Sequence, residues 1–239
     1  MLAFQREEKL NAISTAVERA MLDALAGPEV REARCIVFTG NERAFSAGAD
    51  LLEERDEGTA GIDVYYRDTG DVYERIAALP QPTFSAVSGW CLGAGFELAL
   101  ATDFRIADET AVFGLPEVEL GIVPSSGGTY RLVRAVGPAR AKELLLLKAR
   151  VDAAEAFRLG VVTEVVPAGQ ALARTLELAR QVAELPPLAA SAAKQAADAI
   201  AESSREAGIM LERLAYAALA QTEEAKAAGE AFGARKNPK

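Results

Sequence analysis

The 239-residue sequence contains no histidine. Histidine is the side chain that most often moves protons near neutral pH, so its absence excludes Ser-His-Asp and Cys-His catalysis and His-ligated zinc. Acid–base chemistry must therefore use Asp, Glu, Lys, Tyr or Cys. The two cysteines, Cys35 and Cys91, are too few for a disulfide framework or a cysteine-rich metal site. The sequence predicts no metal site and a reducing compartment.

Basic residues are also in deficit, with 26 Lys and Arg against 35 Asp and Glu and a formal net charge of -9. An acidic surface repels phosphate backbones, which argues against a nucleic-acid partner. No apolar stretch approaches the ~20 residues of a membrane span. Residues 1–9 lack the basic-then-apolar layout of a signal peptide. We therefore predict a cytoplasmic protein with no nucleic-acid or membrane partner.

Periodicity predicts a mixed α/β core followed by a purely helical region. Runs rich in β-branched and aromatic residues that end at glycine predict strands, and amphipathic segments bounded by caps or prolines predict helices. The predicted strands are 33–39, 82–88, 103–107, 111–113 and 162–166; the predicted helices are 14–26, 62–79, 96–101, 128–136, 138–147 and one opened by a capping box at 152–155. Beyond residue 169 strong helix formers dominate, with breaks predicted at 186–187 and near Gly208. We expect an α/β core over 1–167 and a helical region over 168–239.

Glycine-rich segments do not match nucleotide-binding motifs. Gly93 and Gly95 are followed by Leu98 where a dinucleotide fingerprint needs a third glycine, and neither a P-loop nor a Gly-x-Ser-x-Gly elbow is present. Glu97 instead stands in the apolar segment 96–101, where a carboxylate must be paired, hydrogen-bonded or functional unless it faces solvent. Glu117 follows a predicted strand end, where an exposed turn residue is the alternative interpretation.

Several segments, in order, resemble the crotonase (enoyl-CoA hydratase/isomerase) superfamily. They are residues 45–50 (FSAGAD), 87–103 (VSGWCLGAGFELALATD), 113–124 (FGLPEVELGIVP) and 127–129 (GGT). The resemblance covers nearly the whole chain. It implies a spiral of repeated ββα units, a C-terminal region that assembles homotrimers or dimers of trimers, and an acyl-CoA thioester as ligand. Because CoA is part of the substrate, the resemblance implies no separate cofactor.

The resemblance also implies roles for four residues. The backbone N–H groups of Ala49 and Ala94 would form an oxyanion hole for the thioester carbonyl, whereas glycine alone would explain both segments as tight turns. Glu97 and Glu117 would share acid–base work on one water, which favours an enoyl-CoA hydratase. An isomerase or other acyl-CoA enzyme that uses mainly Glu117 is the second hypothesis, and a non-catalytic or RNA-associated member is the third.

Further positions match family segments that line the CoA and acyl path. These are Arg6 as a phosphate ligand, Lys9, Leu10, Ala47, Asp50 and Leu51 along the adenine and pantetheine path, and Gly93 and Ser125 as further substrate-binding positions. For each charged residue, a solvated surface charge is the alternative. Ser125 stands where many relatives have glycine, so its hydroxyl would narrow the pocket or bind a water. Phe232 and Lys236 resemble the part that reaches CoA in a neighbouring subunit.

Overall fold

The computed structural model describes residues 1–53, 59–148 and 150–236. Its strands form two sheets. The first has the order β1 (Leu2–Ala3), β2 (Ile36–Thr39), β4 (Thr83–Val87), β6 (Phe104–Asp108) and β9 (Glu164–Val166), and all neighbours are parallel. The second has the order β3 (Ala44–Ser46), β5 (Trp90–Leu92), β7 (Val112–Gly114) and β8 (Val151–Asp152), with only the last pair antiparallel.

The chain winds between these sheets as a spiral. In each turn one strand enters the first sheet, the next strand enters the second sheet, and a helical segment follows. The strand pairs are β2 with β3, β4 with β5, and β6 with β7. The helical segments after them are α3 (Thr59–Tyr65), π-helical η2 (Tyr66–Gly70) and α4 (Val72–Ala77); α5 (Ala94–Ala101); and η3 (Pro116–Leu120) with α6 (Gly128–Leu146). The predicted α/β fold of repeated ββα units is confirmed.

The first turn is preceded by η1 (Glu7–Lys9), α1 (Thr15–Ala26) and α2 (Pro28–Glu32). Ser14 caps α1 by accepting the N–H of Val17, as expected from the sequence. Asp152 likewise caps α7 (Ala153–Arg158) by accepting the N–H of Glu155 at 2.8 Å. Residues 27–28 were expected only to stop α1. They do so, but Pro28 also begins α2, because proline at the first helical position removes an N–H that needs no partner there.

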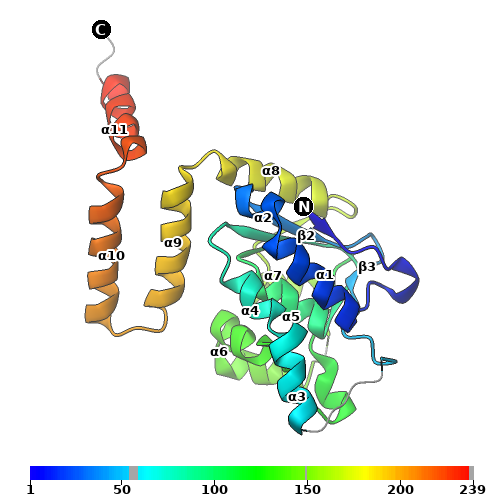
Figure 1. The fold of residues 1–239 in the computed structure, drawn as a ribbon. Helices are drawn as coiled ribbons and strands as arrows, with labels where there is room; N and C mark the ends of the chain where they lie inside the picture. Colours follow the sequence, from blue (N-terminus) through cyan, green and yellow to red (C-terminus); the bar gives the residue numbers. More distant parts are fainter. Residues whose placement is uncertain (54–58, 149, 237–239) are drawn as a thin grey trace.

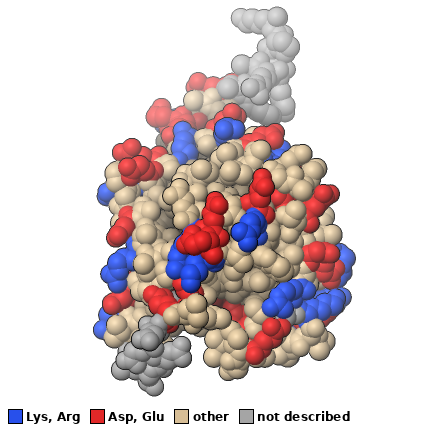
Figure 2. Space-filling view, turned by 90° about the vertical axis from the view of Figure 1, so that its right-hand side faces the viewer, with Lys and Arg blue, Asp and Glu red and all other residues tan. Residues whose placement is uncertain are grey.

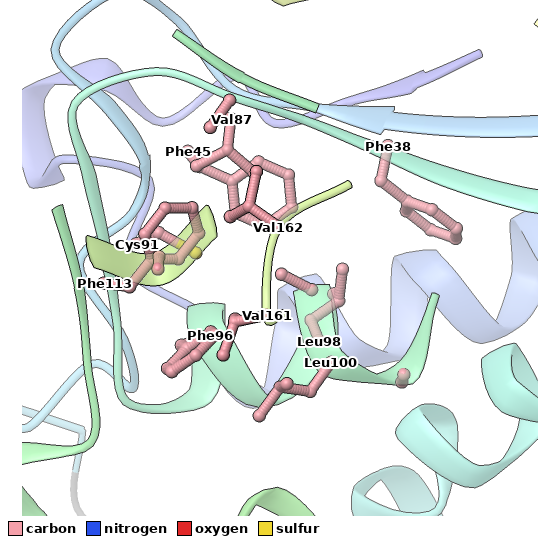
Figure 3. Close-up of a cluster of buried hydrophobic side chains, with 14 of the residues drawn as sticks. Phe38, Phe45, Val87, Cys91, Phe96, Leu98, Leu100, Phe113, Val161 and Val162 are labelled. Carbon is pink, nitrogen blue, oxygen red and sulfur yellow. The ribbon is translucent and has the colours of Figure 1, made fainter. Parts of the chain in front are cut away.

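The buried core lies around α5, between the sheets and the outer helices (Figure 3). Seven of the eight residues of α5 are buried, and Phe96 packs its ring against Phe113 of the second sheet with centroids 5.3 Å apart. A helix that is apolar all round is a core helix. The same burial that stabilises α5 therefore takes its one carboxylate, Glu97, out of water.

The C-terminal region contains α8 (Ala171–Ala183), α9 (Pro187–Ile200), α10 (Arg205–Leu219) and α11 (Glu223–Lys236). α8 packs on the first sheet through Ala179 against Val37 and Phe84. α9 and α10 stand side by side (Figure 1), and α9 contacts the core through Lys194, which pairs with Asp103 at 2.9 Å. The break expected near Gly208 was wrong. The chain turns at 201–204 and Ser204 caps α10, which continues through Gly208.

Large apolar side chains on α9 and α10 are exposed, among them Leu188, Met210, Leu214 and Tyr216. Their exposure accords with an interface between subunits, but the division at residue 167 and the role of 168–239 in trimerisation stay predictions. Within the part of the chain that the structure describes, no helix is long and apolar enough to cross a membrane.

Candidate active site

Three glycine-containing turns meet at one edge of the second sheet. Strands β3, β5 and β7 are parallel, so their carboxyl ends lie together, which is where ligands bind in open α/β sheets. The N–H of Gly93 donates to the carbonyl of Gly114 at 2.9 Å. A Cβ on Gly48, whose φ is +107°, would lie 3.0 Å from the Leu92 oxygen and 3.6 Å from Gly93 Cα. Glycine at 48 and 93 therefore allows the first two turns to touch.

Each of these two turns presents a backbone N–H outside the regular hydrogen-bond ladders. Ala94 is the first residue of α5, so its N–H has no acceptor within the helix and stands at the positive end of the dipole. Ala49 forms a parallel bridge with Ile13, in which the Gly48 carbonyl and the Asp50 N–H make the bonds at 2.8 and 2.9 Å. In such a bridge the N–H of Ala49 points to the opposite side.

Glu97 is buried, with 3% of its surface exposed. Its Oε1 accepts the N–H groups of Ser126 at 2.8 Å and Gly128 at 2.9 Å. Burial raises the pKa of Glu97 above its ordinary value, although these N–H groups and the nearby charge of Arg131 oppose the rise. The alternative that Glu97 faces solvent is therefore wrong. The backbone of the loop before α6 holds the carboxylate in one position.

Sequence reasoning missed these N–H donors, although residues 127–129 were part of the family motif. The available signal was the double glycine. Gly127 has a φ of +87°, and a Cβ on Gly128 would lie 2.6 Å from Glu97 Cγ. A side chain at 128 would therefore overlap the carboxylate that the Gly128 N–H binds.

Glu117 lies in η3, half-buried, on the turn after β7. Burial, together with a smaller contribution from the negative charge of Glu97, raises its pKa to about 7. Its Oε1 lies 3.1 Å from the position that a Cβ on Gly93 would occupy, so the carboxyl group faces the turn that begins α5. Its Oε2 is buried and meets no hydrogen-bond donor among the described residues. A carboxyl group with a pKa near neutrality can both donate and accept a proton.

The N-terminal segment, which is expected to line the CoA path, holds in place the loop that carries Ala49. The Ala47 N–H donates to the Leu10 carbonyl at 2.9 Å, and Arg6 Nη2 pairs with Asp50 Oδ2 at 2.8 Å. The Arg6 guanidinium holds the pKa of Asp50 below its usual range. Arg6 also donates to the Ala12 carbonyl at 3.0 Å, so its guanidinium already serves two acceptors before any phosphate arrives.

Three other residues that were predicted to bind CoA or the acyl group have exposed side chains. Lys9 is exposed at the end of η1, Leu51 is 69% exposed, and Ser125 is exposed with its carbonyl accepting the Tyr66 hydroxyl at 2.7 Å. The side chains of Phe232 and Lys236 lie outside the described part of the chain. Among the residues that the structure describes, no group of three or more His, Cys, Asp or Glu could hold a metal ion.

Asn11 supports the site and was missed as an individual residue. Its amide nitrogen donates to the Ala44 carbonyl at 2.9 Å, and its side-chain oxygen accepts the Arg6 N–H at 3.0 Å. Its φ is +56°, a left-handed conformation that asparagine tolerates better than most residues. A buried asparagine there joins the N-terminal segment to the start of β3.

Comparisons with known proteins identify the family of this chain. The family model described as enoyl-CoA hydratase/isomerase matches residues 1–239. A protein of Rhizobium meliloti (strain 1021) named "Probable enoyl-CoA hydratase" is 39% identical over 237 residues, covering 99% of this chain and 91% of the relative. The crystal structure of an enoyl-CoA hydratase from Bacillus anthracis superposes with a TM-score of 0.90 at 34% identity, over 98% of this chain and 91% of that one. A relative from Thermobifida fusca YX, solved in complex with CoA, gives 0.84 at 30% identity, over 90% and 87%.

The fold and the paired turns thus define an enzyme of the crotonase type. The chain belongs to the enoyl-CoA hydratase/isomerase family. Enzymes of this family typically need no cofactor.

Proposed function

We propose that the protein is an enoyl-CoA hydratase, which adds water across the 2,3 double bond of a 2-enoyl-CoA thioester to give a 3-hydroxyacyl-CoA. The observation that carries the proposal is the pair of carboxyl groups with different environments. Glu97 accepts two backbone N–H groups that favour its ionised form, whereas Glu117 has a pKa of about 7 and a buried oxygen without a described donor. One group is suited to accept a proton and the other to donate one.

The oxyanion hole would polarise the substrate. With the thioester oxygen bound by the N–H groups of Ala49 and Ala94, the carbonyl withdraws electrons from the double bond and C3 becomes electrophilic. Negative charge then gathers on that oxygen in the transition state. One such donor is typically worth about 3 kcal/mol of transition-state stabilisation. The close approach of Gly48 and Gly93 supports this assignment, because it brings the two donor-bearing turns together.

The two glutamates would complete the addition. Glu97 removes a proton from water as the water oxygen bonds to C3, and Glu117 gives its proton to C2. Proton exchange with water then returns Glu97 to its ionised form and Glu117 to its protonated form. The position of Glu97 is set by Ser126 and Gly128 rather than by a flexible partner, which suits a base that must reach one water.

The N-terminal segment and the 47–51 loop would bind CoA, as proposed for Lys9, Leu10, Ala47, Asp50 and Leu51. The Thermobifida relative solved with CoA supports a CoA thioester as ligand. Arg6 is proposed to bind a phosphate of CoA while it remains paired with Asp50. Assembly as a homotrimer or dimer of trimers belongs to the same proposal, whereas the cytoplasmic location remains a prediction from the sequence.

The second candidate is an isomerase that moves the double bond with Glu117 alone, since the family model includes isomerases. An RNA-associated role has less support. On the face shown in Figure 2, basic side chains stand in small groups beside acidic ones and form no continuous basic tract. Such a tract is the usual electrostatic footprint of a nucleic-acid surface.

Two assays on the purified protein decide between the candidates. Hydration is followed as the loss of conjugated enoyl-thioester absorbance with crotonyl-CoA and longer analogues, and isomerisation is followed as its gain from a 3-enoyl-CoA. We expect rapid hydration and slow isomerisation. Isomerisation that exceeds hydration and survives Glu97→Gln would overturn the hydratase proposal in favour of the isomerase. An RNA gel shift that weakens with salt, with no turnover, would support the third class instead.

A further inference from the structure

Glu18 is a buried carboxylate for which the proposed mechanism has no task. It lies on α1, and only 1% of its surface is exposed. No lysine or arginine of the described residues forms an ion pair with it. A buried carboxylate without a cation must be satisfied by hydrogen bonds, and it persists only where those bonds are well made.

The partners of Glu18 are three hydroxyl groups. Tyr65 donates to Oε1 at 2.6 Å, Thr69 donates to Oε2 at 3.0 Å, and Tyr73 donates to Oε1 at 3.4 Å. These residues are spaced by four and belong to α3, η2 and α4 in turn. One carboxylate on α1 therefore binds three successive turns of the helical segment 59–77, including its π-helical turn. Such turns are rare and occur often at functional sites.

The next residue, Tyr66, connects this segment to the active site. Its ring packs edge-on against Tyr65 with centroids 4.9 Å apart, and its hydroxyl donates to the Ser125 carbonyl at 2.7 Å. The following residue, Ser126, donates its N–H to Glu97. Contacts run without a gap from Glu18 through Tyr65 and Tyr66 to the loop that holds Glu97.

A second contact joins the same two segments. Glu74 of α4 pairs with Arg131, whose Nη1 donates to the Ser126 carbonyl at 2.9 Å. The segment 59–77 thus holds residues 125–126 by the Tyr66 hydroxyl on one side and by the Glu74–Arg131 pair on the other. Of these two contacts, the Tyr66 contact depends on the π-helical turn that Glu18 binds.

We propose that Glu18 is a positioning residue: its carboxylate fixes the turn that directs Tyr66 to Ser125, and so holds the Ser126 and Gly128 N–H groups on Glu97. In its catalytic consequence this inference rests on the proposed hydratase function. Its structural part does not, because the hold on residues 125–128 exists without substrate.

The first test is amide hydrogen exchange across residues 124–131, measured by mass spectrometry on the unliganded protein. Tyr66→Phe removes one hydrogen bond, and we expect exchange there to quicken about fivefold. Glu18→Leu removes the acceptor of three hydroxyls and should quicken it at least as much. Glu18→Gln keeps an acceptor for Tyr65 and lets Thr69 accept from the new amide, so exchange should stay near that of the unmodified protein.

The second test is the split between kcat and KM for hydration. We expect kcat to fall about five- to tenfold in Glu18→Leu and in Tyr66→Phe. KM for crotonyl-CoA should change much less than kcat, because residues 6–10 and 47–51, which are proposed to bind CoA, make none of the contacts that link Glu18 to Ser126. The double variant should cost little more than Glu18→Leu alone, since both act through one contact. Glu18→Gln should recover most of kcat.

Two matched variants control for general destabilisation. Asp108→Asn alters another buried carboxylate, which accepts the Ser88 and Thr110 hydroxyls and takes no part in the contacts from Glu18 to Ser126. Thr175→Val removes a buried hydroxyl on α8 that donates to the Ala171 carbonyl at 2.7 Å, outside the measured segment. Neither should change exchange at 124–131 or kcat beyond its effect on unfolding.

The inference is overturned if Glu18→Leu and Tyr66→Phe lower thermal stability while exchange at 124–131 matches that of the controls. If Glu18→Leu does not fold, Tyr66→Phe and Glu18→Gln decide by the same measurement. Absence of hydration in the unmodified protein would refute the proposed function, and the exchange data would still decide the positioning role.

Discussion

Gly128→Ala is the substitution for which the structure gives the sharpest steric expectation. Gly128 begins α6 and its N–H donates to Glu97 Oε1 at 2.9 Å. A Cβ there would lie 2.6 Å from Glu97 Cγ and 2.7 Å from Oε1. Non-bonded heavy atoms are stable at about 3.5–4.0 Å. The glutamate and the start of the helix must therefore separate by about 1 Å to relieve the contact.

That displacement sets the size of the effect. Hydrogen bonds to a charged group contribute about 1.5–3 kcal/mol each, and the shift weakens both N–H bonds to Glu97. Moving a catalytic group by about 1 Å costs on the order of 10²-fold in rate. We therefore expect hydration kcat to fall about 10²-fold with KM nearly unchanged. Overpacking should lower the free energy of unfolding by about 1–3 kcal/mol.

The assay is initial-rate hydration of crotonyl-CoA together with urea unfolding. Gly229→Ala, in α11, is the matched control, because a Cβ at 229 would meet nothing within 4 Å. It should leave kcat unchanged. A Gly128→Ala enzyme whose kcat stays within about threefold of the unmodified protein would show that the Gly128 backbone does not fix a catalytic Glu97.

Three further predictions follow from Glu117 and Arg6. Because burial raises the folded-state pKa of Glu117 to about 7, above its ordinary value, its stabilising contribution is present at low pH and is lost as pH rises through about 7. Glu117→Gln should therefore raise the free energy of unfolding by about 1–2 kcal/mol near pH 8, a value reduced for solvent screening, and by almost nothing near pH 4. Urea unfolding that shows no difference between the two pH values would contradict this. Hydration kcat/KM should decline above about pH 7 as Glu117 loses its proton, whereas a profile flat to about pH 9 would exclude it as the acid. Arg6→Gln should raise KM for crotonyl-CoA several-fold by releasing Asp50, and equal KM values would separate the 47–51 loop from CoA binding.

The parts of this site that the sequence predicted are those where a residue breaks its local pattern. Glu97 is the only charge in an apolar segment, so its importance was visible before the fold was known. The importance of Glu18 was not visible, because its helix also carries Arg19 and Asp23. A carboxylate among charged neighbours is expected to face solvent. Its burial comes from the segment 59–77, far along the chain, which supplies the three hydroxyls.

Two short strands of the second sheet were also not predicted from the sequence. Strands β3 and β5 have three residues each, too few for alternation to show, yet their carboxyl ends place Ala49 and Ala94. Gly208 was misread for a related reason. Glycine lowers helix propensity locally, but here it lies inside α10, where a Cβ would come within 3.1 Å of Ser203 Oγ. Tertiary packing, rather than propensity, decides that position.

A double-mutant cycle shows whether Glu97 and Glu117 act as one unit on one water. Glu97→Gln, Glu117→Gln and the double variant are compared in crotonyl-CoA hydration, with circular dichroism and acetoacetyl-CoA binding to confirm that fold and site persist. We expect each single variant to lose about 10²–10⁴-fold in kcat and the double variant to lose little more than the worse single variant. Near-normal hydration by Glu97→Gln, or losses that multiply in the double variant, would contradict this expectation.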